Sequence, residues 1–566
     1  MSTLPLSSDA LTDASWEDIG PLYEELAQRP LDRHSVEDWL ADWSRLTALI
    51  QEASALALYA YTCDTTDAAK EAAHLRFSSD IQPRAQEQEV RLAARLLDLG
   101  YRPDRLAAMT HRFANQREIF RSDNVPLLSE IEELQTRYQK VTGAMTVEWE
   151  GDRVPVPRMQ LYLEEQDRDV RERAWRNMFR PYVEQRAELA QIFDDLYHLR
   201  QQVAKNAGFA NYRDYAHREK NRFDYSPDDC LRWHESIEKV VVPAVARVRE
   251  RRRTQLGLRA LRPWDMGQDA EGRPPLRPFD GASELIAGCG RIFAALDPAL
   301  AGYFQTMARE QLLDLESRKG KAPGGYCNDY PARKRPVIFM NAVGVHNDVQ
   351  TLLHEAGHAF HCFEWADVEP VFQRFPGSEM CEVASMSMEL LAAPHLERDR
   401  GGFYSAEEAR RARVDHLHAV LSILPHIASV DAFQHWIYTD PDGGDRDARD
   451  VAWLRLRTRF DLGIDWTGLE AERIARWYFQ IHFFCFPFYY IEYGLAQMAA
   501  LQVWRNRLHD PAGALAQYRR ALSLGGTLPL PELFAAAGAR LLFDPEPMQQ
   551  LVGLIEQQLE ELSSQH

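Results

Sequence analysis

The sequence predicts a mainly α-helical protein of two lobes with a small β-sheet. The chain has 566 residues, which is more than one hydrophobic core usually organises. Apolar residues recur every three to four positions through most of the chain, as on one face of an amphipathic helix. Two stretches with strand-like sequence interrupt this pattern, and we expect the β-structure there.

The helical pattern is clearest in residues 35–99, 123–141 and 167–207, and it resumes from Asn347 nearly to the C-terminus. Residues 145–163 alternate around a Glu-Gly-Asp turn, which predicts a short hairpin. Residues 260–281 are rich in Pro and Gly and predict an irregular excursion. Residues 335–343, RPVIFMNAV, have a β-branched and aromatic centre and predict a strand directly before the next helix.

Composition limits the partners and the compartment. Acidic residues outnumber basic residues by 85 to 66, giving a formal net charge of −19, which argues against nucleic acid and anionic membranes as partners. The one basic run, residues 246–259, is interpreted as a solvated helix face. The seven cysteines include no CxxC pair, which predicts reduced thiols rather than a disulfide framework. The N-terminus is unlike a secretory signal, so we expect the protein in the cytoplasm.

The segment TLLHEAGHAFHCF, residues 351–363, carries the strongest chemical signal. His354 and His358 are four residues apart, so on a helix both rings face one ion, and Glu355 sits beside them as a candidate general base. Asn347 is a candidate cap for this helix. Gly357 costs roughly 1 kcal/mol within a helix, so we expect another backbone or a substrate to approach closely there.

A catalytic zinc usually has a third protein ligand. His361 is three residues past His358, so its ring should point away, and we interpret it as a packed histidine. The segment PGSEMCEVASMSMELL, residues 376–391, offers three glutamates instead. Glu382 and Glu389 share a helix face, whereas Glu379 suits the helix dipole. We choose Glu382 as the ligand and Glu389 as a hydrogen-bond partner of a ligand histidine.

Several stretches in order now resemble one family. They are KAPGGYC (321–327), PVIFMNAVG (336–344), NDVQTLLHEAGHAFH (347–361), SEMCEVASMSMELL (378–391) and HFFCFPFYYIEYGLA (482–496). Together they resemble the thimet oligopeptidase and oligoendopeptidase F family of zinc peptidases. In that family the glutamate in the position of Glu382 ligates zinc. The resemblance also implies that His482 and a tyrosine among Tyr489, Tyr490 and Tyr493 act near the reacting carbonyl, with Tyr489 and Tyr493 favoured.

The resemblance implies a mainly α, two-lobed metallopeptidase with a gluzincin-type helix, a deep substrate channel and a small sheet near the zinc. Its domains would be a mostly helical N-terminal lobe, residues 1–205, and a catalytic domain, residues 206–566. The strand 336–343 would be an edge to which an extended peptide adds by backbone hydrogen bonds. The expected substrate-binding residues are Gly324, Gly325, Tyr326, Phe339, Asn341 and Tyr490.

The predicted function is hydrolysis of internal bonds in short, unstructured peptides by a zinc oligopeptidase. One Zn²⁺ per chain, held by His354, His358 and Glu382, would activate water, with Glu355 as general base. One alternative is a zinc carboxydipeptidase on the same scaffold. Another, of a different class, is a non-catalytic helical peptide-binding or scaffold protein. The expected partners are peptides, with neither nucleic acid nor membrane, and the oligomeric state stays open.

Overall fold

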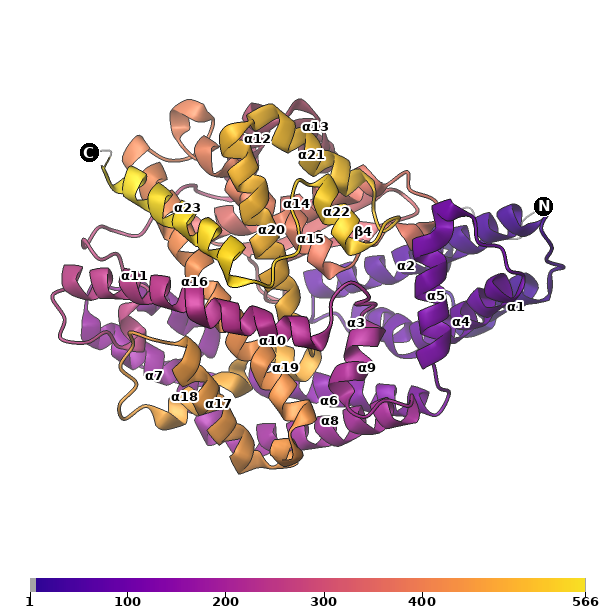
Figure 1. Cartoon of the computed structure of the whole chain (residues 1–566), viewed down its shortest axis with the longest axis horizontal. Helices are drawn as coiled ribbons and strands as arrows, with labels where there is room; N and C mark the ends of the chain where they lie inside the picture. Colours follow the sequence, from indigo (N-terminus) through magenta and orange to yellow (C-terminus); the bar gives the residue numbers. More distant parts are fainter. Residues whose placement is uncertain (1–6, 565–566) are drawn as a thin grey trace. The chain divides into compact units, whose positions relative to one another are not determined.

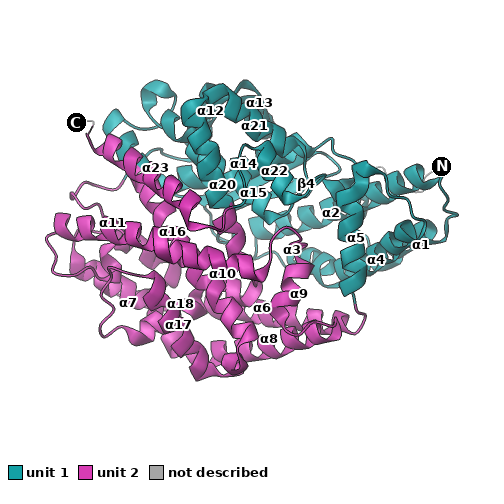
Figure 2. Cartoon of the chain, viewed as in Figure 1, with its two compact units in different colours: residues 1–120, 276–413, 496–541 teal, residues 121–275, 414–495, 542–566 magenta. Residues whose placement is uncertain are grey.

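The computed structural model describes residues 7–564, and the chain forms two compact units, each gathered from three stretches (Figure 2). Unit 1 comprises Met1–Phe120, Leu276–Arg413 and Ala496–Leu541, and unit 2 comprises Arg121–Pro275, Val414–Leu495 and Leu542–His566. The predicted lobes, residues 1–205 and 206–566, follow different limits and stay a prediction. None of the helices in residues 7–564 is both long enough and apolar enough to cross a lipid bilayer.

Unit 1 combines helices with a three-stranded sheet (Figure 1). Its helices are α1 Trp16–Gln28, α2 Val36–Cys63, α3 Ala68–Leu75, α4 Gln82–Asp98, α5 Ala107–Ile119, α12 Ala282–Leu296, α13 Pro298–Arg309, α14 His346–Trp365, α15 Ser378–Ala392, α21 Pro511–Ser523 and α22 Leu530–Ala536. Trp39 and Trp43, both 0% exposed, lie in a core that α1, α2, α4 and α5 share. The mainly helical character expected from the apolar periodicity is therefore confirmed in this unit.

The sheet of unit 1 has the strand order β3-β5-β4, with bounds Leu313–Glu316, Arg335–Ala342 and Tyr326–Tyr330. β5 pairs in parallel with β3 and antiparallel with β4. The predicted strand is thus confirmed, but its predicted place at an edge is wrong, because β5 is the central strand. Its buried run of five consecutive residues is typical of a strand that is covered on both faces.

The described residues of unit 2 form helices and a single hairpin. Its helices are α6 Asn124–Gly143, α7 Arg168–Glu184, α8 Arg186–Asn206, α9 Tyr212–Glu219, α10 Pro227–Ser236, α11 Val242–Gln255, α17 Arg446–Phe460, α18 Glu470–Phe479, α19 Ile481–Cys485 and α23 Pro545–Ser564. Helices α16 (Ala406–Thr439) and α20 (Tyr490–His509) contain residues of both units. The hairpin joins β1 (Thr146–Trp149) to β2 (Asp152–Pro155), as predicted. Its turn residues Glu150 and Gly151 both have positive φ, at 53° and 94°, as two-residue hairpin turns require.

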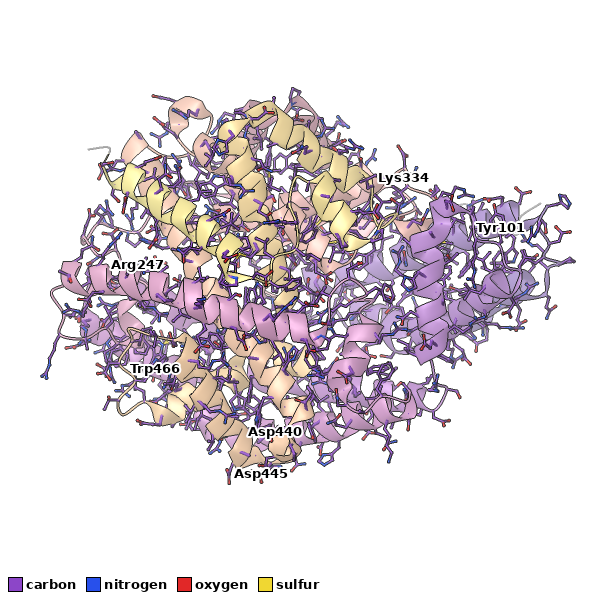
Figure 3. The ribbon with its side chains drawn as sticks, in the orientation of Figure 1. Tyr101, Arg247, Lys334, Asp440, Asp445 and Trp466 are labelled. Atoms are coloured by element: carbon purple, nitrogen blue, oxygen red, sulfur yellow. The ribbon has the colours of Figure 1, made fainter. Side chains whose placement is uncertain are left out.

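The basic run on α11 is only partly a solvated face. Arg247, labelled in Figure 3, donates to Glu556 at 2.6 Å with half of its side chain exposed. Arg249 donates to Asp461 at 2.7 Å, and its side chain is only 11% exposed. Intramolecular partners therefore take up much of the positive charge of this run.

Candidate active site

Helix α14 carries His354 and His358, and the carboxylate of Asp348 caps its N-terminus. Asp348 accepts the backbone N–H groups of residues 343–345 at 2.8, 2.9 and 3.0 Å. These three donors lie at the positive end of the helix, where an acceptor is most effective. The predicted cap, Asn347, lies inside the helix instead, so the capping role belongs to Asp348.

Helix α15 packs directly against α14 at Gly357. A Cβ atom at this glycine would lie 2.5 Å from Ser385 Cα and 2.6 Å from Ala384 O, both backbone atoms. The expectation that another backbone approaches Gly357 is therefore confirmed. Tyr518, on α21, holds the same segment of α15 by donating its hydroxyl to Ala384 O at 2.8 Å.

This packing brings the three predicted metal ligands together. Glu382 Oε2 lies 3.4 Å from His354 Nε2 and 3.6 Å from His358 Nε2. One donor atom from each of the three residues lies within 4.8 Å of the others. Glu389 Oε1 lies 2.7 Å from His354 Nδ1, so this carboxylate accepts the Nδ1 proton and fixes the ring with Nε2 toward Glu382, where a metal ion would take the place of a second proton. Two imidazole nitrogens and one carboxylate oxygen match a zinc site, so the residues fit that ion.

Charge in the cluster also favours a cation. Burial lowers the pKa of His358 to about 4, so this ring is neutral at neutral pH. Burial acts in the same direction on His354, but the hydrogen bonds with Glu382 and Glu389 outweigh it and raise the pKa of His354 well above its ordinary value. The Glu382 carboxylate therefore lies beside a position that positive charge would stabilise, and Glu389 adds negative charge at the other nitrogen of His354.

Glu355 lies on α14 beside the cluster and contacts the edge strand β4. It is 8% exposed, and the backbone N–H of Cys327 on β4 acts on its carboxylate to lower its pKa. Burial, the largest effect, raises the pKa of Glu355 to about 7. A carboxylate whose pKa is close to the operating pH suits a general base. His361, by contrast, is 1% exposed, and its ring packs against that of Trp365 with the centroids 4.2 Å apart, as expected of a packed residue.

Comparison with known proteins identifies the family of this chain. The model of Peptidase family M3 matches residues 161–553. The chain belongs to peptidase family M3. Oligopeptidase PepF of Bacillus subtilis (strain 168) is 23% identical over 274 residues, which is 48% of this chain and 39% of that relative. The chain therefore matches well under half the length of this curated relative.

Solved structures resemble this M3 chain along nearly its whole length. PZ peptidase A, solved with an inhibitor, is 27% identical with a TM-score of 0.90, covering 97% of this chain and 98% of that one. A putative oligoendopeptidase F is 26% identical with a TM-score of 0.89, covering 97% of each chain. A putative oligoendopeptidase F from Bacillus anthracis str. Ames, 23% identical over 97% of this chain and 96% of that one, has a TM-score of 0.85 and supports the fold. The predicted family and the mainly helical fold with small sheets are thus confirmed.

The loop before β4 is fitted closely to β5. Asn341 Nδ2 donates to Ala322 O at 2.8 Å and to Gly324 O at 2.9 Å. A Cβ at Gly325 would meet β5 atoms at 3.3 Å, so this loop needs its glycine for packing. These contacts give Asn341 and the glycines a role in shaping the loop, and their predicted contacts with substrate stay a prediction.

Two aromatic residues of the predicted substrate set stack on each other. The rings of Tyr326 and Phe339 are 4.9 Å apart, and the Tyr326 hydroxyl hydrogen-bonds Thr62 Oγ1 at 2.7 Å. Phe339 is 1% exposed, and its backbone pairs with strands on both sides. The structure therefore argues against direct peptide contact by Phe339, whereas Tyr326 lies on the edge strand.

His482 and the three predicted tyrosines cluster in unit 2. The His482 ring centroid lies 4.5 Å from that of Tyr490 and 6.2 Å from those of Tyr489 and Tyr493. Tyr489 and Tyr493 are 5.0 Å apart, as expected from their spacing. The roles predicted for His482 and these tyrosines in catalysis stay a prediction. Gln480, which belongs to no motif, donates its amide to His482 Nδ1 at 2.7 Å.

Two buried polar residues anchor the backbone around this cluster. Arg200, 0% exposed, donates to the carbonyls of Phe483, at 2.8 Å, and of Phe484. Gln434 Oε1 accepts the N–H of Phe488 at 2.7 Å, where the backbone has a positive φ of 59°. A positive φ is uncommon for a phenylalanine, so these contacts hold the chain in a conformation it would rarely adopt alone.

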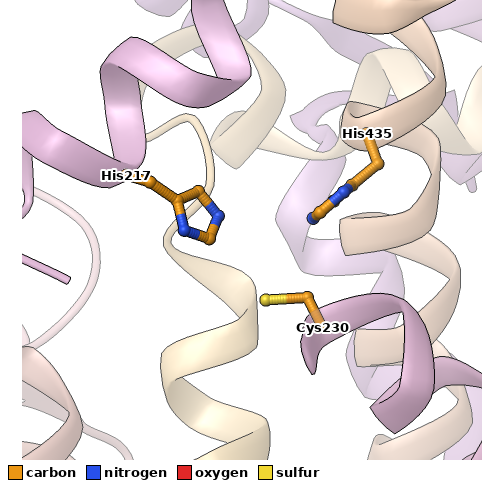
Figure 4. Close-up of side chains that lie close together, drawn as sticks. All are labelled: His217, Cys230 and His435. Atoms are coloured by element: carbon orange, nitrogen blue, oxygen red, sulfur yellow. The ribbon is translucent and has the colours of Figure 1, made fainter. Parts of the chain in front are cut away.

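A second group of metal-ligand types occurs in unit 2, where His217, Cys230 and His435 point toward one another (Figure 4). Their donor atoms lie within 4.8 Å, and all three residues are buried. However, Arg222 Nη1 lies 3.4 Å from His217 Nε2, and Asp431 Oδ2 lies 3.3 Å from His435 Nε2. A buried guanidinium beside a donor nitrogen opposes a second cation, so we assign no ion to this group.

Proposed function

We propose that this chain is a zinc-dependent oligopeptidase that hydrolyses internal bonds of short, unstructured peptides. The convergence of His354, His358 and Glu382 carries the proposal, because it supplies a complete zinc donor set within a family of peptidases. Relatives named oligopeptidase and oligoendopeptidase support the preference for short peptides and internal bonds. A reducing cytoplasm, expected from the cysteine spacing, would be its compartment.

The side chains divide the chemistry among them. His354, His358 and Glu382 would hold the zinc ion, which when bound supplies Lewis acidity and lowers the pKa of water. Glu355 takes a proton from the attacking water and delivers it to the leaving amine. His482 and a tyrosine donate hydrogen bonds to the carbonyl oxygen as it gains negative charge.

The edge strand β4 supports a mode of peptide binding. An extended peptide paired with β4 would lie along the strand whose Cys327 N–H acts on the Glu355 carboxylate. Backbone pairing of this kind gives affinity with little dependence on side chains. Tyr326, also on β4, remains our candidate for contact with the peptide.

The decisive experiment compares single-atom changes. Glu355→Gln should retain zinc but lower kcat on a peptide blocked at both ends by about 10²–10⁴-fold, the range for a general base. Glu382→Gln should lose zinc, whereas Glu379→Gln, the matched control on the same helix, should keep it. Full activity of Glu355→Gln, or zinc loss in Glu379→Gln alone, would reject the assignments.

The same assay separates the alternatives. A carboxydipeptidase would remove dipeptides from a free C-terminus and leave the blocked peptide intact. A non-catalytic binding protein would cleave neither substrate, with or without a chelator. Internal cleavage that stops when a chelator removes the metal is the result expected of the proposed enzyme.

A further inference from the structure

A directed chain of hydrogen bonds within unit 2 ends at His482. Arg457 Nη1 lies 3.1 Å from His426 Nδ1, and His426 Nε2 lies 3.3 Å from Gln480 Oε1. Gln480 Nε2 then lies 2.7 Å from His482 Nδ1. Arg457, 4% exposed, is itself fixed by Asp461 at 2.7 Å. Helix α17 provides the arginine, α16 provides His426, and Gln480 directly precedes α19.

The arginine sets the direction of every bond in this chain. A guanidinium only donates, so His426 Nδ1 accepts and the neutral ring carries its proton on Nε2. That N–H donates to Gln480 Oε1, and the amide oxygen is thereby occupied. The NH₂ group of Gln480 therefore faces His482, and because it only donates, His482 Nδ1 must accept. Burial, the largest effect, lowers the pKa of His426 to about 3, which keeps this ring neutral.

We propose that Gln480 is a positioning residue that holds His482 as the neutral tautomer with its proton on Nε2, a hydrogen-bond donor to the scissile carbonyl oxygen. The inference rests on the proposed function, which makes His482 a donor to that oxygen. The opposite tautomer would present a lone pair from Nε2 to an oxygen that is gaining negative charge. The Gln480 amide thus determines whether the His482 ring stabilises or repels the negative charge on the carbonyl oxygen.

Two further observations support this role. Burial lowers the pKa of His482 to about 4, so the ring stays neutral at neutral pH and its tautomer matters. Burial raises the pKa of Tyr490, and the Gln480 side chain acts on the same phenol in the opposite direction. The rings of His482 and Tyr490 are 4.5 Å apart and nearly perpendicular, at 71°. Gln480 therefore acts on two of the residues assigned to the carbonyl region.

Two substitutions of nearly equal size test the inference. Gln480→Glu replaces the donor with an acceptor, so a neutral His482 ring must carry its proton on Nδ1 and present a lone pair from Nε2, and the assay is run at a pH where His482 of this variant is neutral. We expect kcat to fall about 10²-fold with KM within about twofold, as for loss of one preorganised donor. Gln480→Met removes the donor without adding charge, and a smaller loss of about tenfold is expected. The control, Gln202→Glu, makes the same charge change at an exposed position of α8 and should leave kcat unchanged.

A double-mutant cycle separates positioning from general support of the fold. If Gln480 acts through His482, then Gln480→Met should cost nothing further once His482→Phe is in place. Losses that multiply in the double variant would overturn the inference. Zinc content and melting temperature are measured in each variant to identify any that is misfolded. If Gln480→Glu is misfolded, Gln480→Met is used in its place.

Imidazole ¹⁵N NMR reads the tautomer without any need for activity. In histidine-labelled protein, the His482 signals are those that His482→Phe removes. We expect a protonated Nε2 in the wild type and a protonated Nδ1 in Gln480→Glu. If the wild type cleaves peptides but its His482 carries the proton on Nδ1, this inference is rejected and the proposed function stands. If His482 has the expected tautomer but the protein cleaves no peptide, the proposed function is rejected and the tautomer assignment stands.

Discussion

Replacing Gly357 with alanine should separate the two helices that hold the metal ligands. The added Cβ would lie 2.5 Å from Ser385 Cα, whereas ordinary contact begins at 3.4 Å, a shortfall of 3.4 − 2.5 = 0.9 Å. The atoms in the way are backbone, so no side-chain rotation relieves the overlap. Metal–ligand distances tolerate only about 0.2 Å, so a shift near 0.9 Å takes Glu382 out of the coordination sphere.

Stability and metal binding should respond differently to this change. Overpacking costs about 1–3 kcal/mol, but alanine favours the helix over glycine by about 1 kcal/mol, so Gly357→Ala should still fold. Loss of a hydrogen bond that supports a ligand lowers metal affinity by up to about 100-fold. The zinc affinity of Gly357→Ala should fall by more than this, because a ligand itself is displaced. The decrease in zinc affinity would therefore be larger than the small change in the free energy of unfolding can explain.

The assay is a competition titration of zinc against a chromophoric chelator, together with a thermal melt of the metal-free protein. The matched control is Gly302→Ala on α13, where an added Cβ meets nothing within 4 Å. That control should keep its zinc and gain up to about 1 kcal/mol of stability. If Gly357→Ala binds zinc as tightly as Gly302→Ala does, the link between helix contact and coordination is refuted.

Three further changes are expected to have distinct effects. Glu389→Ala removes the carboxylate 2.7 Å from His354 Nδ1 and should weaken zinc binding about 10–100-fold in the same titration; unchanged affinity would show that another group orients the ring. His217, 4% exposed, has its pKa lowered by burial to about 2, so below pH 6.5 only the unfolded chain binds this proton. Its contribution to the free energy of unfolding should therefore decrease by about 2 kcal/mol by pH 5, and urea melts of His217→Phe should lack that decrease. Lys321→Met removes a fully buried ammonium that lies 3.0 Å from Asp314 and donates to the carbonyls of Glu316 and Met340; because Arg318 still pairs with Asp314, we expect a cost of about 1–3 kcal/mol in urea melts, and unchanged stability would contradict the importance of this ammonium.

Local sequence predicted the elements whose pattern is long or whose side chains are distinctive. The β-branched centre of β5 identified that strand, and the Glu150-Gly151 turn identified the hairpin. β3 reads LDLE and β4 reads YCNDY, which are short and polar, so neither has a strand signal of its own. They become strands by pairing with β5. The edge position that the family resemblance implied for β5 is therefore wrong, since both neighbours lack a local signal.

The same distinction between local and long-range information applies to the site. The spacing of His354, Glu355 and His358 is a property of one helix, so these residues could be predicted together. Glu382 depends on how α15 packs, and it was chosen through its helix face and the family resemblance. The bond between His426 and Gln480 joins residues 54 positions apart with no motif at either end. Only the folded arrangement reveals that connection.

The three-part construction of unit 1 has a consequence for biosynthesis. The final stretch, Ala496–Leu541, includes Tyr518, whose hydroxyl holds the segment of α15 that lies against Gly357. A ribosome translates this stretch long after Glu382, and domains generally fold as units. The nascent chain therefore lacks this stretch of the unit that carries the proposed zinc site until well after Glu382 has been made. Such timing would keep a protease inactive while its own unfolded polypeptide is still emerging.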